Sequence, residues 1–269
     1  MKSMLRYIRS LGNKKTRHEE QKFIVEGVRA VEELLKTPGT RFVVVFTEEL
    51  GQNQRGKKLL AELDKNKIEK YLISGQELEQ VSECDTPSGI LAVVQTREVS
   101  LEDILSPEKP FLVILDDLQD PGNAGTIIRT AEAAGVTGVV LSQSSVDPYN
   151  SKVVRASMGS ILRMPVIRHG NIPSLLDRLK ARGIRVIACA TQGAKYYYEE
   201  DWCLPLALVL GNEGAGLKKD LLAKVSSTVK IPQKHSVESL NVASAGAIIM
   251  YQVVEKARKK VQRCRGVKG

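Results

Sequence analysis

The chain carries a glycine-rich segment at residues 211–216, which reads Gly-Asn-Glu-Gly-Ala-Gly. The segment follows the apolar run Leu-Ala-Leu-Val-Leu, which predicts a buried strand. Ligands bind α/β sheets at the carboxyl ends of strands, and glycines there let the main chain approach a flat ligand closely. The order reverses the GxGxxG motif and lies late in the chain, which argues against a nicotinamide dinucleotide. A glycine-rich turn without a ligand is the alternative.

A second segment with chemical potential is LDDLQDPGNAGTIIRTAEAAG, at residues 115–135. An apolar strand is predicted to end at Asp116 and Asp117, and a turn follows in which Asn123 is a plausible helix N-cap. Arg129 then lies in a helix that is otherwise small and apolar. An arginine in such a helix either extends to solvent, which is the commoner case, or serves a buried anionic site.

The third segment, residues 231–253, leads from a strand end at Ile231 through a polar loop into a helix rich in Ala, Ser and Gly. Ser239 and Asn241 lie just before that helix. Small residues at the start of a helix allow close packing against backbone or ligand, and tight helix–sheet packing is the alternative. Metal chemistry is not expected, because the four cysteines and three histidines are scattered without zinc-ligand spacing.

The net charge of +9 is unevenly distributed. Residues 1–105 hold 17 basic and 17 acidic side chains, whereas residues 106–269 hold 23 and 14. Six basic residues precede the first acid, and the tail 256–269 is basic without an acid. Such clusters suit a polyphosphate partner such as RNA, although a solvated tail is the alternative. No apolar run is long enough for a membrane helix, and the start lacks a secretory apolar core, so a cytoplasmic protein is expected.

The helices and strands that must position these residues are predicted to form an α/β protein of two domains. Residues 1–100 alternate helices and strands, and residues 21–37 show helical periodicity. Residues 97–110 are polar, contain two prolines and resemble a linker. From residue 106 to 269, strands alternate with helices, which predicts a mostly parallel sheet covered on both faces.

Together the three segments resemble the SpoU/TrmH family of RNA 2′-O-ribose methyltransferases, within the SPOUT superfamily. The matching text is DDLQDPGNAGTIIRTA, LVLGNEGAGL and IPQKHSVESLNVASAGAI, in the order and at the separations of the family. NKKTRHEEQKFIVEGVRAVEELL and TPSGILAVV resemble the RNA substrate-binding domain that often precedes such enzymes. One departure is that Gln233 and His235 stand where the family commonly has Met and Gly. This departure affects the expected backbone shape of the loop after Ile231. We interpret His235 as an exposed residue of that loop.

The resemblance implies an α/β catalytic domain with a C-terminal trefoil knot. It also implies a bent S-adenosylmethionine (AdoMet) held largely by main-chain groups, and a homodimer with active sites near the interface, to which the last helix contributes. The cofactor-binding residues carried over from the family are Gly211, Ile231, Leu240, Leu210, Thr191, Gly216 and Ala243.

The implied reaction is methyl transfer to a ribose 2′-hydroxyl, which mainly requires alignment in a dry site and removal of one proton. In the family the proton-accepting role is assigned to the arginine that Arg129 matches. Because a free guanidinium has a pKa above ~12, the alternative is that Arg129 holds the phosphate and ribose while a phosphate or water accepts the proton. The supporting polar residues are Asn123, Glu213, Ser239 and Asn241.

We therefore expect residues 106–269 to methylate structured RNA, above all ribosomal RNA and the large subunit in particular. Residues 1–100 are expected to bind RNA, chiefly through the first eighteen residues. Two alternatives remain open. One is a non-catalytic RNA-binding or ribosome-assembly protein, which should carry damaged motifs. The other is a ribosomal RNA methyltransferase that confers antibiotic resistance by the same chemistry.

Overall fold

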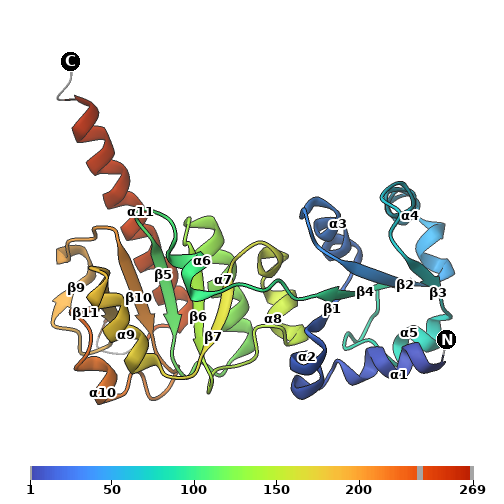
Figure 1. Ribbon diagram of the computed structural model, residues 1–269, viewed down its shortest axis with the longest axis horizontal. Coiled ribbons are helices and arrows are strands. Elements are labelled where there is room, and N and C mark those ends of the chain that lie inside the picture. The colour runs from blue at the N-terminus through green and yellow to red at the C-terminus, as the bar shows by residue number, and fades with distance from the viewer. Residues whose placement is uncertain (1, 235–238, 267–269) are drawn as a thin grey trace. The chain divides into compact units, whose positions relative to one another are not determined.

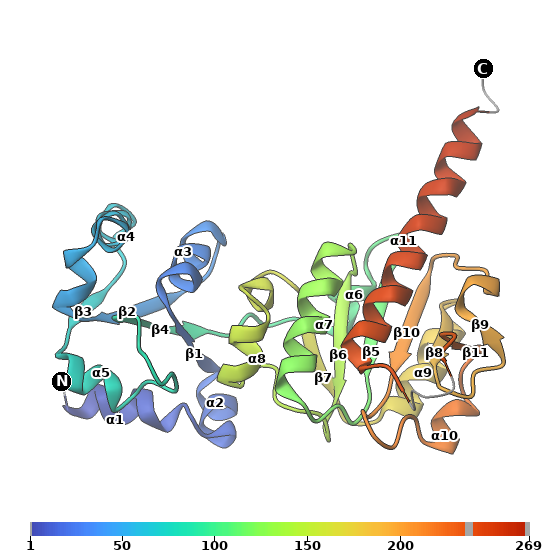
Figure 2. The same ribbon diagram turned by 180° about the vertical axis from the view of Figure 1, so that it is seen from behind.

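The computed structural model describes residues 2–234 and 239–266 (Figures 1 and 2). These residues form two compact units. The first comprises Met1–Glu98 together with Tyr149–Arg163, and the second comprises Val99–Pro148 together with Met164–Gly269. In the described residues no helix is both long enough and apolar enough to cross a membrane.

The first unit is a four-stranded sheet with helices on both faces (Figure 1). Its strand order is β1-β4-β2-β3, in which β4 runs antiparallel to both neighbours and β2 pairs with β3 in parallel. Its elements are α1 (Lys2–Ser10), α2 (Lys14–Glu20), β1 (Lys22–Glu26), α3 (Val28–Lys36), β2 (Phe42–Phe46), η1 (Glu48–Gln52), α4 (Gln54–Lys65), β3 (Lys70–Leu72), α5 (Gly75–Glu79), β4 (Ile90–Gln95), α8 (Ser151–Ala156) and η2 (Ser160–Leu162).

The prediction of one continuous helix over residues 21–37 is wrong. The structure instead has strand β1 followed by helix α3, with Gly27 between them at φ +107°. Only glycine adopts this backbone angle without strain, so Gly27 divides the segment. Phe23, Ile24 and Val25 are all buried in the strand, which pairs with β4 along its whole length. Burial on both faces of the sheet therefore outweighs the helical spacing.

A segment from the middle of the chain belongs to the first unit. The Tyr149 ring packs on Phe23 with their centroids 4.8 Å apart, and the Arg163 guanidinium pairs with the Glu33 carboxylate at 2.9 Å. Within this segment, Gly159 at φ +88° separates helix α8 from the short helix η2. The compact units thus divide the chain differently from the predicted domain ranges 1–100 and 106–269.

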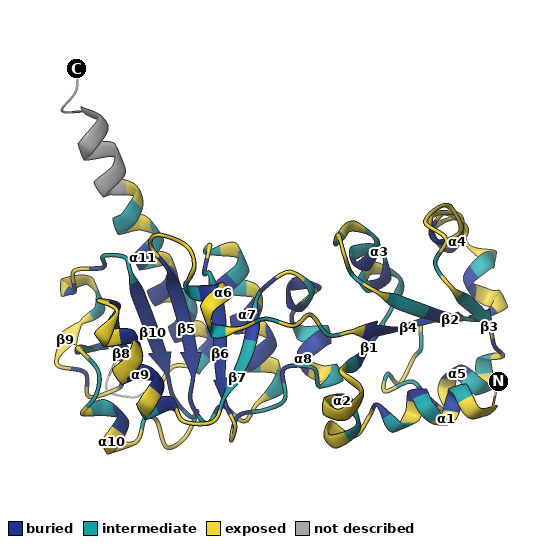
Figure 3. Cartoon of the chain, viewed as in Figure 1, coloured by how far each residue is buried: buried dark blue, intermediate teal, exposed yellow. Residues whose placement is uncertain are grey.

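The second unit is a seven-stranded, entirely parallel sheet of order β7-β6-β5-β10-β8-β11-β9. The predicted α/β class with a mostly parallel sheet is confirmed, and the central strands are buried on both sides (Figure 3). Its elements are α6 (Leu101–Leu105), β5 (Phe111–Leu115), α7 (Pro121–Ala133), β6 (Gly138–Ser142), β7 (Val166–His169), α9 (Ile172–Ala181), β8 (Arg185–Cys189), β9 (Lys195–Tyr196), η3 (Tyr197–Glu199), β10 (Leu206–Leu210), α10 (Lys219–Leu222), β11 (Ser227–Lys230) and α11 (Val242–Gly266).

The two faces of this sheet carry different helices (Figures 1 and 2). On one face, Leu112 and Ile114 of β5 pack with Ile104 of α6 and leucines of α9. On the other face, α11 packs on α7 and β10. A Cβ at Gly246 of α11 would lie only 2.8 Å from Leu210 Cδ1, so glycine allows this close contact. Part of the expected linker 97–110, the helix α6, is therefore a core element of the second unit.

Candidate active site

A cavity of about 550 Å³ opens at the carboxyl ends of β8, β10 and β11 in the second unit. This is the edge at which parallel α/β sheets bind ligands. The lining comes from the ends of these three strands, from the segments that follow them, including α10, and from the start of α11. It consists of Cys189, Ala190, Thr191, Gln192, Leu210, Gly211, Asn212, Glu213, Gly214, Ala215, Gly216, Leu217, Leu222, Thr228, Ile231, Gln233, Ser239, Leu240, Val242 and Ala245.

Most of the predicted cofactor-binding residues line this cavity. They are Thr191, Leu210, Gly211, Gly216, Ile231 and Leu240. Ala243 does not line it and is buried in the first turn of α11, next to the lining residue Val242. The prediction missed Cys189, Gln192 and Thr228, which follow or belong to strands β8 and β11 and could have been found from that position. Gln233 lines the cavity, whereas His235 lies outside the described residues.

The glycine turn after β10 is closed by its own backbone. Asn212 and Gly216 exchange N–H to carbonyl hydrogen bonds of 3.1 and 3.0 Å, and Gly216 has φ +67°. A Cβ on Gly211 would lie 2.6 Å from the carbonyl carbon and oxygen of Gly216. Glycine is thus required at position 211 by the turn itself. We expected the missing side chain of Gly211 to let a ligand approach closely, but its close neighbour is the Gly216 backbone.

The walls of the cavity are nearly free of charge. Among the lining residues that the structure describes there is no Lys, Arg or His, and Glu213 supplies the one carboxylate. Burial raises the pKa of the Cys189 thiol to about 11, so this group is neutral. A phosphorylated nucleotide needs cationic or N–H donors for its phosphates. The lining, which combines apolar side chains with uncharged polar ones, instead suits a ligand that is neutral or cationic.

A chain of side-chain hydrogen bonds connects the three segments singled out in the sequence. Glu213 accepts hydrogen bonds from the Nδ2 of Asn123 at 3.2 Å and from the backbone N–H of Asp120 at 3.0 Å. The Oδ1 of Asn123 accepts from the Nδ2 of Asn241 at 2.8 Å, and the Oδ1 of Asn241 accepts from the N–H of Ala243 at 2.9 Å. Because an ionised carboxylate only accepts, it fixes the orientation of both amides.

The N-cap of α7 differs from the expected one. Asp120 is the N-cap, and its Oδ1 accepts from the N–H of Asn123 at 2.6 Å. Pro121 occupies the first helical position, where its fixed φ and missing N–H cost nothing. Asn123 therefore sits within the first turn, and its side chain is available to bridge Glu213 and Asn241.

Comparison with known proteins identifies the family. Residues 110–251, more than half of the chain, match the model of the SpoU rRNA methylase family. The chain belongs to the SpoU rRNA methylase family. Residues 2–92 of this SpoU methylase match the model of the MRM3-like substrate binding domain. The predicted resemblance is therefore confirmed.

Relatives of known structure or activity align over nearly the whole chain of this SpoU methylase. The 23S rRNA (guanosine(2553)-2′-O)-methyltransferase RlmP of Bacillus subtilis is 38% identical over 91% of this chain and 93% of its own. The AdoMet-bound rRNA methyltransferase of Sinorhizobium meliloti is 30% identical, with a TM-score of 0.81 over 93% of each chain. The SpoU methyltransferase AviRb of Streptomyces viridochromogenes, in complex with AdoMet, is 27% identical, with a TM-score of 0.85 over 94% of this chain and 97% of its own.

Two predicted catalytic residues of this SpoU methylase, Ser239 and Arg129, lie outside the hydrogen-bonded chain of Glu213, Asn123 and Asn241. Ser239 lines the cavity beside Leu240. Arg129 is exposed on α7, the helix that packs on α11, and it does not line the cavity. The structure brings Asn123, Glu213 and Asn241 together by hydrogen bonds. Arg129 makes none that joins it to them within the described part of the chain.

The Glu213→Gln variant of this SpoU methylase is expected to have a free energy of unfolding that is lower by about 1–2 kcal/mol at neutral pH. Both carboxylate oxygens of Glu213 accept hydrogen bonds, and in glutamine an NH₂ group replaces one of these acceptors. Burial alone raises the pKa of Glu213, but hydrogen bonds from its own backbone, Asp120, Asn123 and Gln119 outweigh it and hold the pKa below its usual value.

A carboxyl group with a lowered folded-state pKa stabilises the fold fully above its unfolded pKa, about 4.3. That stabilisation is lost as the pH falls through the folded pKa. The difference in unfolding free energy between wild type and Glu213→Gln should therefore shrink between about pH 7 and about pH 3 in urea titrations. An equal difference at both pH values would contradict the assignment.

Proposed function

We propose that this protein transfers the methyl group of AdoMet to a ribose 2′-hydroxyl of ribosomal RNA, with the large-subunit 23S rRNA as the favoured substrate. The observation that carries the proposal is the nearly uncharged cavity beside the hydrogen-bonded Asn123, Glu213 and Asn241. Family membership confirms the predicted enzyme class, and the AdoMet-bound neighbours confirm the predicted cofactor.

The residues of the cavity fit AdoMet. Its volume lies within the range of small-molecule pockets, about 300–1,000 Å³. Leu210, Ile231 and Leu240 offer apolar surface for the adenine, and the hydroxyls of Thr191 and Thr228 offer hydrogen bonds to the polar groups. The absence of cationic side chains from the described lining suits a sulfonium. When bound, AdoMet supplies an electrophilic methyl group.

The protein's own residues mainly align the acceptor and exclude water. The chain Glu213–Asn123–Asn241 fixes the start of α7 relative to the start of α11, and so fixes one wall of the site. We propose that Arg129 contacts the ribose or its phosphate, and that Ser239 hydrogen-bonds the acceptor ribose. The non-catalytic alternative is disfavoured, because all three motifs are intact and joined by hydrogen bonds.

The proposal is tested by mapping 2′-O-methylated nucleotides in total RNA from cells with and without this protein. One ribosomal RNA nucleotide should lose its methyl group when the protein is absent and regain it in vitro with purified protein and AdoMet. Unchanged methylation at every ribosomal RNA position would overturn the proposal. A change confined to transfer RNA would redirect the substrate assignment.

We propose further that the second unit forms a homodimer through α7 and α11. In the single chain, the apolar side chains of Ile248 and Tyr251 on α11 are 38% and 50% exposed, and a partner subunit would cover them. This pairing would bring the exposed Arg129 of α7 into an interface. We also propose the trefoil knot that the resemblance to the family implies. A cytoplasmic location and a metal-free reaction remain predictions.

Among the basic residues of the first eighteen positions, we propose that those of α1 bind the RNA. Lys2, Arg6 and Arg9 of α1 line a hollow of about 290 Å³. Arg17, in contrast, is buried, and its guanidinium donates to the carbonyls of Leu11 and Gly12 at 2.8 Å. Arg17 therefore supports the α1–α2 turn, and the α1 cations are the better phosphate ligands.

Replacing both Arg6 and Arg9 with glutamate is expected to weaken RNA binding and to reduce the slope of log affinity against log salt by about 2, one unit for each lost phosphate contact. AdoMet affinity should not change. The matched control is the exposed pair Lys57 and Lys58 of α4, also changed to glutamate. If both double variants lower the slope equally, α1 is not a specific RNA contact.

A further inference from the structure

A cluster of aromatic rings is formed by Tyr196 of β9 and by Tyr197 and Tyr198 of η3; we call it the tyrosine platform. Tyr196 and Tyr198 are exposed, and Tyr197 is half-buried. The rings of Tyr196 and Tyr198 are stacked, with centroids 5.4 Å apart and planes inclined by 10°. Tyr197 meets the Tyr198 ring edge-on at 5.4 Å. Tyr198 nevertheless remains 49% exposed, so the cluster is not explained by core packing.

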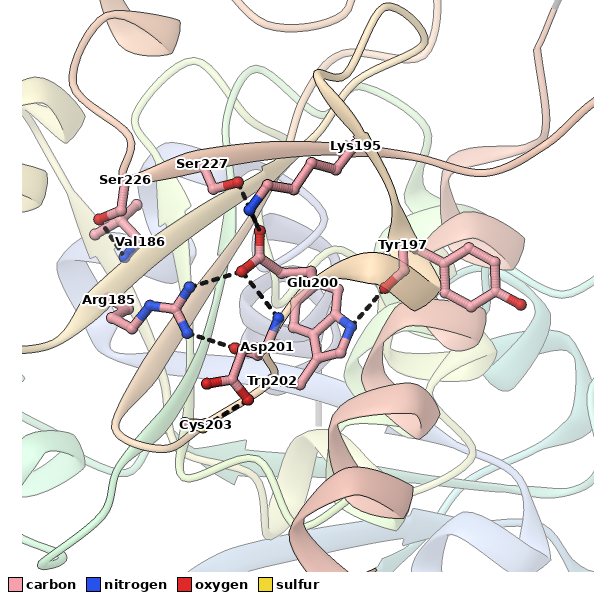
Figure 4. A network of polar contacts seen from close by, with 10 residues as sticks. All are labelled: Arg185, Val186, Lys195, Tyr197, Glu200, Asp201, Trp202, Cys203, Ser226 and Ser227. Atoms are coloured by element: carbon pink, nitrogen blue, oxygen red, sulfur yellow. Dashed lines mark hydrogen bonds and ion pairs between the residues drawn. The ribbon is translucent and has the colours of Figure 1, made fainter.

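The segment that carries the platform is firmly anchored (Figure 4). Glu200 is buried and accepts hydrogen bonds from Arg185 Nη2 at 2.7 Å and from Ser227 Oγ at 2.6 Å. Trp202 is fully buried, and its indole N–H donates to the Tyr197 carbonyl at 2.7 Å. The exposed rings therefore project from a preorganised backbone, which lowers the entropic cost of binding a ligand.

The platform adjoins the cofactor cavity through two strands. Tyr196 pairs with Lys230 in the β9–β11 register, and the next residue, Ile231, lines the cavity. On the other side, the lining residues Thr191 and Gln192 lead into β9. The platform is therefore joined to the cavity lining through both β9 and β11.

Two lysines flank the rings. Lys230 Nζ lies 4.9 Å from the centroid of the Tyr196 ring, and Lys195, whose side chain is 53% exposed, pairs with the buried Glu200 carboxylate at 3.7 Å. Aromatic faces beside cationic groups are the combination that binds unpaired nucleotides, because bases stack on the rings and phosphates pair with the cations. A fully paired helix does not offer its base faces in this way.

We propose that the tyrosine platform stacks an unpaired base of the substrate RNA that flanks the methylated nucleotide, with Lys230 holding a neighbouring phosphate. The proposal rests on the proposed function, because it requires RNA at the cavity. It adds a subsite in the catalytic unit that selects single-stranded or loop nucleotides.

The test measures binding of the full-length protein to two probes, a short unpaired oligoribonucleotide that contains a fluorescent purine and a fully paired RNA duplex. Tyr198→Ala should bind the unpaired probe about tenfold or more weakly and should lose quenching of the purine. Tyr198→Phe, which keeps the ring, should bind like wild type, and Tyr198→Leu should bind like Tyr198→Ala. Duplex affinity and AdoMet affinity should stay unchanged in all three variants.

Equal affinity of Tyr198→Ala and wild type for the unpaired probe would overturn the platform. A change from dimer to monomer in Tyr198→Ala would also overturn it, because the rings would then contact a second copy of the chain. These readouts are binding measurements, so they are independent of turnover. Failure of the wild-type protein to methylate ribosomal RNA would instead count against the proposed function.

Discussion

Replacing Arg129 with alanine is expected to lower the rate of RNA methylation by at least about 100-fold, the usual loss when a group that assists proton transfer or aligns the acceptor is removed. AdoMet affinity should stay unchanged, because Arg129 does not line the cavity. The rate is measured by transfer of labelled methyl groups to ribosomal RNA at saturating AdoMet, and the affinity by calorimetry.

The matched control for Arg129→Ala is Arg182→Ala, which removes an exposed arginine from the end of α9. Its partner Glu102 keeps a second ion pair with Arg178, so little stability should be lost. Arg182→Ala should methylate at the wild-type rate. Near wild-type turnover in Arg129→Ala would show that the guanidinium only extends to solvent.

Replacing Thr191 with tryptophan is expected to weaken AdoMet binding by at least about 100-fold, because a large side chain would fill part of a cavity of ordinary ligand size. Thr191 is exposed and lines the cavity, so the change should not disturb the sheet core. Gly211 is a poor place for this test, since any side chain there collides with the Gly216 backbone.

The conservative variant Thr191→Ser separates the volume of the side chain from its hydroxyl. It should bind AdoMet within a fewfold of wild type, whereas Thr191→Trp should not. Thermal unfolding of all three proteins, without AdoMet, checks that the fold is intact. Wild-type AdoMet affinity in Thr191→Trp would place the cofactor elsewhere.

Much of the fold was predictable because long apolar strands and amphipathic helices follow simple periodicities. The failures have specific physical causes. Gly27 adopts a positive φ and divides a segment whose apolar spacing looked continuous. Helix α6 was hidden by its polar sequence, although Ser100 and Asp103 form a capping box and Ile104 is buried. Strand β9 has only two residues, too few for a periodic pattern.

The site was predictable where residues follow strand ends, and less so where side chains meet across the fold. Gly211 and Ile231 could be placed in the cavity from their positions after β10 and β11. The bridge from Glu213 through Asn123 to Asn241 joins residues 90 and 118 positions apart, which no local pattern encodes. The resemblance to a family selected these residues, and the structure supplies their connections.

The position of β10 has a consequence for the order of folding. This central strand follows β5 and β8 in the chain but pairs between them, so neither can complete the sheet until residues 206–210 arrive. Pairings of such long sequence separation are slow to form. The start of α11 then closes the cavity, so a chain that lacks residues 239–245 holds no complete cofactor site. The ability to bind AdoMet is therefore acquired only after β10, β11 and the start of α11 have joined the sheet.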